Sequence, residues 1–138
     1  MILVSACLVG ENCKYSGGNN LCPAVVSYLE GKDYVTFCPE QAGGLPTPRL
    51  PSEIWEGRVL SQEGTDVTAQ FKAGAAAALG VCREKGVTLA ILKQSSPSCG
   101  TETVYDGTFS GTKRPGRGVT AALLADNGIP VLGENNFS

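Results

Sequence analysis

Short runs of apolar residues alternate along the chain with segments whose apolar positions recur at helical spacing. The apolar runs predict buried strands, and the helical spacing predicts helices between them. We expect strands at residues 2–6, 34–37, 87–92 and 129–132, and helices at residues 21–30, 67–85 and 120–126. This alternation is typical of an α/β fold, here a single-domain three-layer sandwich of Rossmann-like type with a mostly parallel sheet.

Turn-forming residues define the segments between these elements. Gly86 is expected to end the longest helix. Residues 41–51 contain two adjacent glycines and three prolines, which exclude regular structure and favour a functional loop. We expect a short edge strand or an extended segment at residues 55–60 and a hairpin-like excursion at residues 103–109.

The composition fits one globular domain over residues 1–138, with 42% hydrophobic and 17% charged residues. A net charge of −2 argues against nucleic-acid binding, and the short basic stretch 113–117 is interpreted as a solvated loop. No apolar run approaches the roughly 18 residues of a membrane span, so we expect a cytoplasmic protein without a membrane partner. In the reducing cytoplasm, six cysteines favour free thiols, metal ligands or redox chemistry over structural disulfides.

Three cysteines follow predicted strands directly, at the start of tight turns. Cys7, Cys38 and Cys99 are distant in sequence, but the carboxyl ends of parallel strands converge on one crevice. The chain has no histidine and no Cys-x-x-Cys pair, so the usual zinc signatures are missing and an iron-sulfur cluster is favoured. Three ligands in place of four would leave one iron open to bind something else.

The other three cysteines receive different interpretations. Cys22, at the start of the first helix, and Cys82, within the long helix, are interpreted as small buried hydrophobes. Cys13 lies in the polar turn after the first strand, near enough to Cys7 to be a fourth ligand or a resolving thiol.

Two oxygen-bearing residue types accompany the thiols. Glu40 follows Cys38 by two positions and is the leading general acid or base in a chain without histidine. Its structural alternative is a helix-terminus cap or an ion pair with Arg49 or Lys93. The serines of the turn 95–100 either bond to a substrate or the cluster sulfurs, or only shape the turn.

A series of short motifs, weak one by one, is specific in its order and combination and spans nearly the whole chain. With these motifs the chain resembles the thiouracil desulfidases, a small bacterial family long described as a domain of unknown function. The motifs are Ser5-Ala6-Cys7-Leu8-Val9-Gly10, Cys13-Lys14-Tyr15, Cys38-Pro39-Glu40, Gly43-Gly44-Leu45-Pro46-Thr47-Pro48-Arg49, Asp66-Val67-Thr68, Ser96-Pro97-Ser98-Cys99-Gly100, Tyr105-Asp106-Gly107-Thr108-Phe109 and Gly118-Val119-Thr120-Ala121.

The resemblance implies a [4Fe-4S] cluster held by Cys7, Cys38 and Cys99, whose fourth iron binds the sulfur of a thiolated nucleobase. It places the family's catalytic glutamate on Glu40 and its catalytic serine on Ser96, with Ser98 as the alternative. Thiouracil would become uracil, and the sulfur would leave as hydrogen sulfide without net electron transfer. The partner would be a small molecule, and the protein a monomer or homodimer.

Two other functions stay open at the level of the sequence. One is a non-enzymatic iron-sulfur or metal-binding redox or iron sensor that uses Cys13 as a fourth ligand. The other is a metal-free thiol enzyme, whose reactive cysteine would need a helix terminus, Lys93 or Arg49 to lower its pKa.

Overall fold

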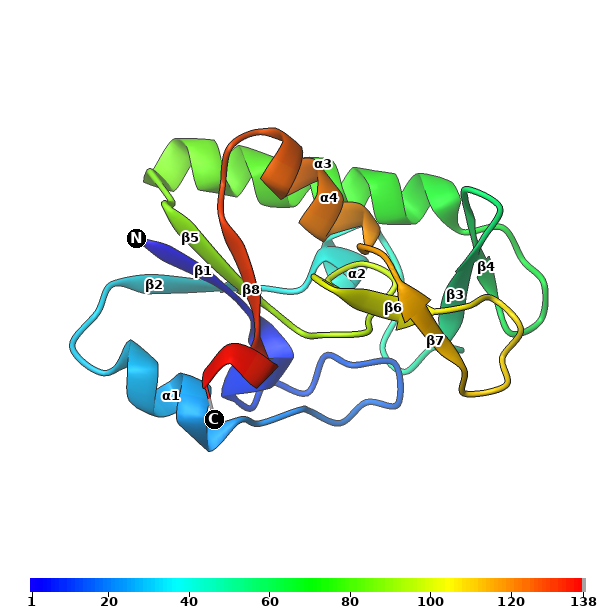
Figure 1. Cartoon of the computed structure of the whole chain (residues 1–138), viewed down its shortest axis with the longest axis horizontal. Coiled ribbons are helices and arrows are strands. Elements are labelled where there is room, and N and C mark those ends of the chain that lie inside the picture. The colour runs from blue at the N-terminus through cyan, green and yellow to red at the C-terminus, as the bar shows by residue number, and fades with distance from the viewer. Residues whose placement is uncertain (138) are drawn as a thin grey trace.

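The computed structural model describes residues 1–137 and is organised around a four-stranded sheet (Figure 1). In space the strands follow the order β2 (Tyr34–Phe37), β1 (Ile2–Ser5), β5 (Leu89–Leu92) and β8 (Val131–Gly133). All three pairings are parallel, and Ile2 pairs with Tyr34 on one side and Leu89 on the other. The predicted α/β class with a parallel sheet is confirmed.

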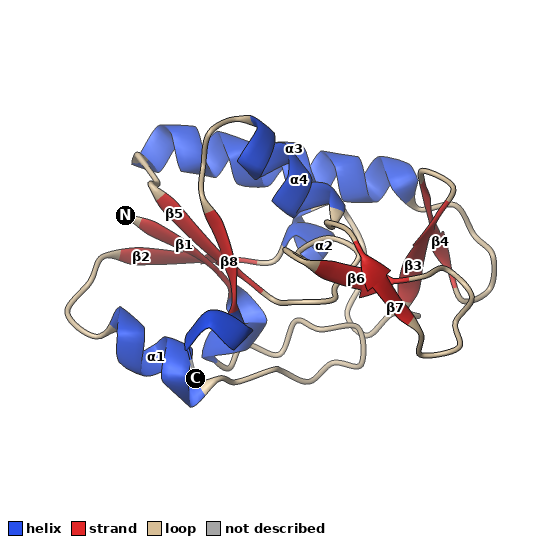
Figure 2. Cartoon of the chain, in the orientation of Figure 1, coloured by secondary structure: helices blue, strands red, loops and turns tan. Residues whose placement is uncertain are grey.

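Helices cover both faces of this sheet (Figure 2). The long helix α3 and the shorter α4 lie together on one face, and α1 lies on the other. The helices are α1 (Pro23–Leu29), α2 (Pro39–Ala42), α3 (Thr68–Lys85) and α4 (Val119–Asp126), with 3₁₀ helices at Ala6–Val9 and Glu134–Phe137. No helix among residues 1–137 is both long and apolar enough to span a membrane.

The period of two along β1 divides the core into two layers. Leu3 belongs to the cluster that includes Ala78 of α3 and Leu124 of α4. Its neighbour Val4 points to the opposite face and joins the cluster that contains Val25 of α1. Because successive side chains of a strand point to opposite faces, a fully apolar run is what a central strand covered on both sides requires. The three-layer architecture follows from this burial.

The strand order places a crevice at a defined point of the sheet. The chain moves from β1 to the neighbour β2 through α1, and then crosses back to β5 on the other side of β1 through α3. The two crossovers lie on opposite faces, so their loops diverge at the carboxyl ends of β1 and β5. Ligands of open α/β sheets bind at such a switch point.

Two antiparallel hairpins extend beyond the main sheet, and the sequence analysis missed part of each. The expectation of one edge strand or extended segment at 55–60 is wrong in missing the turn at residues 56–57, because β3 (Ser52–Trp55) and β4 (Arg58–Ser61) form a hairpin. The second hairpin pairs β6 (Thr103–Tyr105) with β7 (Lys113–Pro115). Residues 113–115 are therefore an exposed strand and not the expected loop.

The loop predicted at 41–51 begins with an unpredicted short helix. Its first two residues complete α2, which packs closely on α3. Gly43 and Gly74 make this packing possible, because a Cβ at Gly74 would overlap the Pro39 carbonyl oxygen and one at Gly43 the Gln70 carbonyl oxygen. Glycine at both contacts thus fixes the position of the segment that carries Cys38 and Glu40.

Substituting Gly74 by alanine tests this packing. We expect the added methyl to push α2 away from α3 and to lower the free energy of unfolding by about 1–3 kcal/mol. The matched control is Gly80→Ala in the same helix, where a Cβ meets nothing within 4 Å. There the higher helix propensity of alanine should raise stability by about 0.5–1 kcal/mol. Urea denaturation measures the free energy of unfolding of both variants. Equal changes at the two positions would contradict the packing argument.

Candidate active site

One cavity of about 510 Å³ opens at the switch point of the sheet. Its volume is in the range of small-molecule sites. The segments that follow β1, β2 and β5 contribute Cys7, Cys38 and Cys99 to its lining, as the strand-end argument expected. The lining also includes Glu40 and Ser96. All five site residues predicted from the sequence therefore come together in space.

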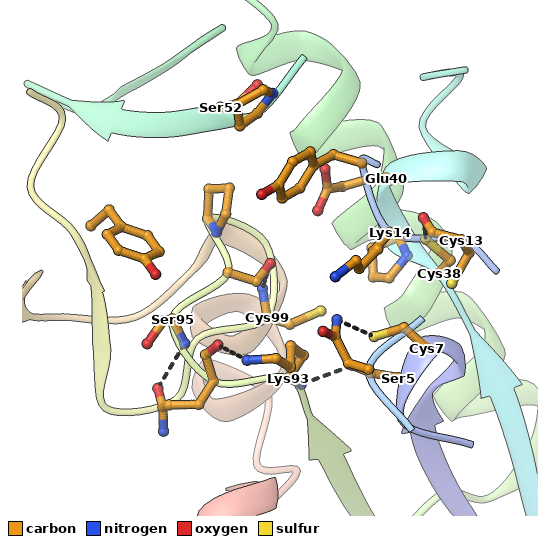
Figure 3. A pocket seen from close by; sticks show the side chains of 18 of the residues that line it. Ser5, Cys7, Cys13, Lys14, Cys38, Glu40, Ser52, Lys93, Ser95 and Cys99 are labelled. Carbon is orange, nitrogen blue, oxygen red and sulfur yellow. Dashed lines mark hydrogen bonds between the residues drawn. The ribbon is translucent and has the colours of Figure 1, made fainter. Parts of the chain in front are cut away.

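Cys13 lies between two of the predicted ligands. Figure 3 shows Cys7, Cys13 and Cys38 grouped on one side of the cavity, with the Cys99 thiol pointing toward them. Hydrogen bonding to the Cys13 thiol lowers the pKa of Cys7, and the same thiol lowers the pKa of Cys38 to about 6. Sharing its proton with both sulfurs correspondingly raises the pKa of Cys13. The arrangement favours the ionised form of Cys38 and the protonated form of Cys13.

Each predicted ligand sulfur also has a further hydrogen-bond donor. The Asn20 side-chain amide donates to the Cys7 sulfur at 3.4 Å. The backbone amide of Gln41, in the first turn of α2, donates to Cys38. Ser5 hydrogen-bonds Cys99, although burial is the larger effect and raises the pKa of that thiol to about 12. Donors of this kind stabilise a sulfur that carries negative charge.

Glu40 faces the same cavity from α2, above the cysteines in Figure 3. The Nε of Arg49 donates to its Oε1 at 3.1 Å, and the two side chains are 6% (Arg49) and 18% (Glu40) exposed. Burial raises the pKa of Glu40, and the neighbouring guanidinium opposes that rise. The ion pair with Arg49 that the sequence offered as the structural alternative is present, and Glu40 also lines the cavity. Its role as a general acid or base stays a prediction.

Arg49 connects the glutamate to the loop that holds Cys13. Its Nη2 donates to the Cys13 carbonyl oxygen at 3.0 Å, while its own backbone amide donates to the Tyr15 carbonyl oxygen at 2.7 Å. A single guanidinium thus joins α2 to the turn after β1. These bonds give Arg49 a structural role within the Gly/Pro-rich loop.

The two candidate serines have different surroundings. The Ser96 hydroxyl lines the cavity and accepts hydrogen bonds from the backbone amides of Ser98 and Cys99, each at 3.1 Å. Both of its acceptor positions are used, so its proton is free to be donated. Ser98 is buried and bonds to the Thr120 hydroxyl at 2.7 Å, outside the cavity lining. The geometry favours Ser96 over Ser98.

Gln94 organises the turn that carries Cys99, and sequence reasoning missed it. Its Oε1 accepts hydrogen bonds from four backbone amides, at 2.9–3.2 Å, and its Nε2 donates to the Thr101 hydroxyl at 2.8 Å. The only signal in the sequence is its place two residues after β5. The neighbouring Lys93 also lines the cavity, and its Nζ lies 3.7 Å from Oε1 of Glu134.

The two cysteines interpreted as hydrophobes lie away from the cavity lining. Cys82 is buried in the core under α3, and Cys22 packs against the cluster under α1. Burial raises the pKa of the Cys82 thiol, as expected for an inert core residue. Among residues 1–137, no group of three or more His, Cys, Asp or Glu side chains is close enough to hold a single metal ion.

Fold and cavity together define an α/β protein whose strand ends deliver thiols, a carboxylate and a hydroxyl to one site. The chain matches the 2-thiouracil desulfurase family over residues 2–136, and it belongs to this family. The resemblance stated from the motifs is confirmed.

Two relatives support this membership. The chain is 41% identical over 148 aligned positions to the uncharacterised protein YbbK of Bacillus subtilis (strain 168), covering 100% of this chain and 98% of YbbK. The solved structure of a [4Fe-4S]-dependent thiouracil desulfidase, TudS, shares 45% identity and a TM-score of 0.92, over 98% of this chain and 91% of that one.

Proposed function

We propose that this protein is a non-redox [4Fe-4S]-dependent desulfidase that hydrolyses the C=S bond of thiolated pyrimidines such as 2-thiouracil. The observation that carries the proposal is the convergence of Cys7, Cys38 and Cys99 on one cavity. Membership of the 2-thiouracil desulfurase family and the likeness to TudS support both the substrate class and the cofactor.

The donor set of the cavity fits an iron-sulfur cluster. Cysteine thiolate is the normal ligand of such clusters, and the site offers thiols without any imidazole. Each cysteine of a [4Fe-4S] cluster binds a different iron, so the three sulfurs have no need to surround one point. The hydrogen bonds from Asn20, Ser5 and the Gln41 amide would complete the ligand environment.

The proposed reaction adds water to the thiocarbonyl carbon and releases hydrogen sulfide, so that C=S becomes C=O and no electrons are gained or lost. When bound, the cluster would supply a Lewis-acidic iron for the soft substrate sulfur. Glu40 would accept a proton from the attacking water and pass one to the leaving sulfur. Ser96, whose hydroxyl proton is free, would donate to the exocyclic carbonyl oxygen of the base and orient the substrate.

Anaerobic reconstitution tests the proposal. We expect protein that binds about four irons and four acid-labile sulfides per chain, and that converts 2-thiouracil to uracil with release of an equal amount of sulfide. Iron and sulfide analysis, together with chromatography of the base, measures each quantity. A reconstituted protein that holds the cluster and releases no sulfide from any thiolated pyrimidine would refute the substrate assignment.

A further inference from the structure

Glu53 is a carboxylate in the cavity lining that the proposed reaction does not use. It lies on β3 and only 8% of the residue is exposed. Within residues 1–137, no lysine or arginine is within ion-pair distance of it. A buried carboxylate without a cation needs hydrogen-bond donors to be stable.

Its donors come from the tip of the second hairpin. The Oε1 atom of Glu53 accepts from the backbone amides of Gly107 at 3.0 Å and Phe109 at 3.1 Å. In the described chain, these are the only hydrogen bonds that join residues 106–112 to any other segment; all others of that tip stay within it. One carboxylate oxygen therefore attaches the whole tip to β3.

The hairpin that Glu53 attaches forms part of the cavity wall. Tyr105, Phe109 and Lys113 of the hairpin line the cavity, and Ser52, next to Glu53, lies on a different side of it from the cysteines in Figure 3. Phe109 has a φ of 56°, a left-handed conformation that costs energy for an aromatic residue and persists only where contacts enforce it.

The packing of Gly107 against β3 also requires the tip to stay in this position. Gly107 has a φ of 95°, and a Cβ there would lie 2.7 Å from the Ile54 carbonyl oxygen and from the Trp55 ring. The tip is therefore fitted closely against β3 at the point where Glu53 holds it.

We propose that Glu53 is a positioning residue that closes the aromatic wall of the substrate site by holding the amides of Gly107 and Phe109. This inference rests on the proposed function in taking the cavity as a site for a planar heterocycle. Tyr105 and Phe109 offer ring faces and edges to such a ligand, but only while the tip stays against β3. Glu53 acts through these residues and touches no reacting atom.

The test compares Glu53→Ala with Glu53→Gln in anaerobically purified protein. Glutamine keeps one carbonyl oxygen for both amides, whereas alanine removes the acceptor. In the alanine variant we expect hydrogen exchange at Gly107 and Phe109 to accelerate at least about 10-fold, with unchanged exchange in the main sheet. The glutamine variant should remain within about threefold of the wild type. Glu63→Ala, at an exposed loop position, is the matched control.

Function is measured on the same variants. For the alanine variant we expect the KM for 2-thiouracil to rise about 10-fold with kcat and iron content nearly unchanged, and the glutamine variant to restore KM. Calorimetry should show the same loss of affinity for uracil. Unchanged exchange and affinity in Glu53→Ala, or equal losses in Glu53→Gln, would overturn the inference. If the wild type releases no sulfide, the proposed function fails, and exchange and uracil affinity alone decide the role of Glu53.

Discussion

Replacing Cys7, Cys38 or Cys99 by serine, one at a time, is expected to remove the cluster and abolish sulfide release. A hydroxyl is a harder and far less acidic ligand than a thiol, so it does not replace a thiolate on iron. After anaerobic reconstitution, iron and acid-labile sulfide should fall below about a tenth of the wild-type content. The visible absorption of the protein reports the same loss.

The remaining cysteines supply the controls for this prediction. Cys22→Ser and Cys82→Ala should keep the cluster, since both residues lie outside the cavity lining. Cys13→Ser should keep it as well, because the Cys13 thiol acts as a hydrogen-bonding neighbour of Cys7 and Cys38 and a serine hydroxyl is also a donor. Loss of iron in Cys13→Ser, with full content in a wild-type control, would instead favour a four-cysteine sensor.

The position of these thiols was predictable because it depends on local sequence. A run of apolar residues covered on both faces predicts a central strand, and parallel strands present their carboxyl ends to one edge of the sheet. Cys7 and Cys99 follow such runs directly or at the next turn, and Cys38 directly follows the edge strand β2. No knowledge of distant contacts was needed to expect them in one crevice.

The hairpin at β3 and β4 was not predictable in the same way. Its turn consists of Glu56 and Gly57, which have φ values of 49° and 77°. Tight hairpin turns of this kind favour asparagine or aspartate before the glycine, and glutamate is an unusual choice. Without that signal the sequence pattern shows one strand in place of two, and it does not reveal the β3–β4 hairpin.

Gln94 and Glu53 show why the rest of the site was beyond sequence reasoning, whereas Arg49 was expected as an ion-pair partner of Glu40. Each of the two accepts hydrogen bonds from backbone amides of another segment, 7 to 9 positions away for Gln94 and 54 to 56 for Glu53. No periodicity or motif encodes such bonds, because they exist only once the strands have placed the segments. The cysteines define the site, but these residues hold its walls in place.

Glu40→Gln is expected to lower kcat for 2-thiouracil by about 10²- to 10⁴-fold while the cluster content stays at the wild-type level. Glutamine has nearly the same volume and keeps an oxygen for the hydrogen bond from Arg49, but its amide cannot take a proton from water. The loss should therefore appear in kcat with little change in KM.

Glu53→Gln is the matched control, since it makes the same chemical change at the other carboxylate of the cavity. Because Glu53 holds backbone amides and transfers no proton, its kcat should stay within about twofold of the wild type. Anaerobic turnover assays normalised to iron content separate the two variants. Equal kcat values for Glu40→Gln and the wild type would mean that water is activated without this carboxylate. Equal losses in both variants would point instead to the negative charge of the cavity, because each substitution removes one charge but only Glu40 is placed to move a proton.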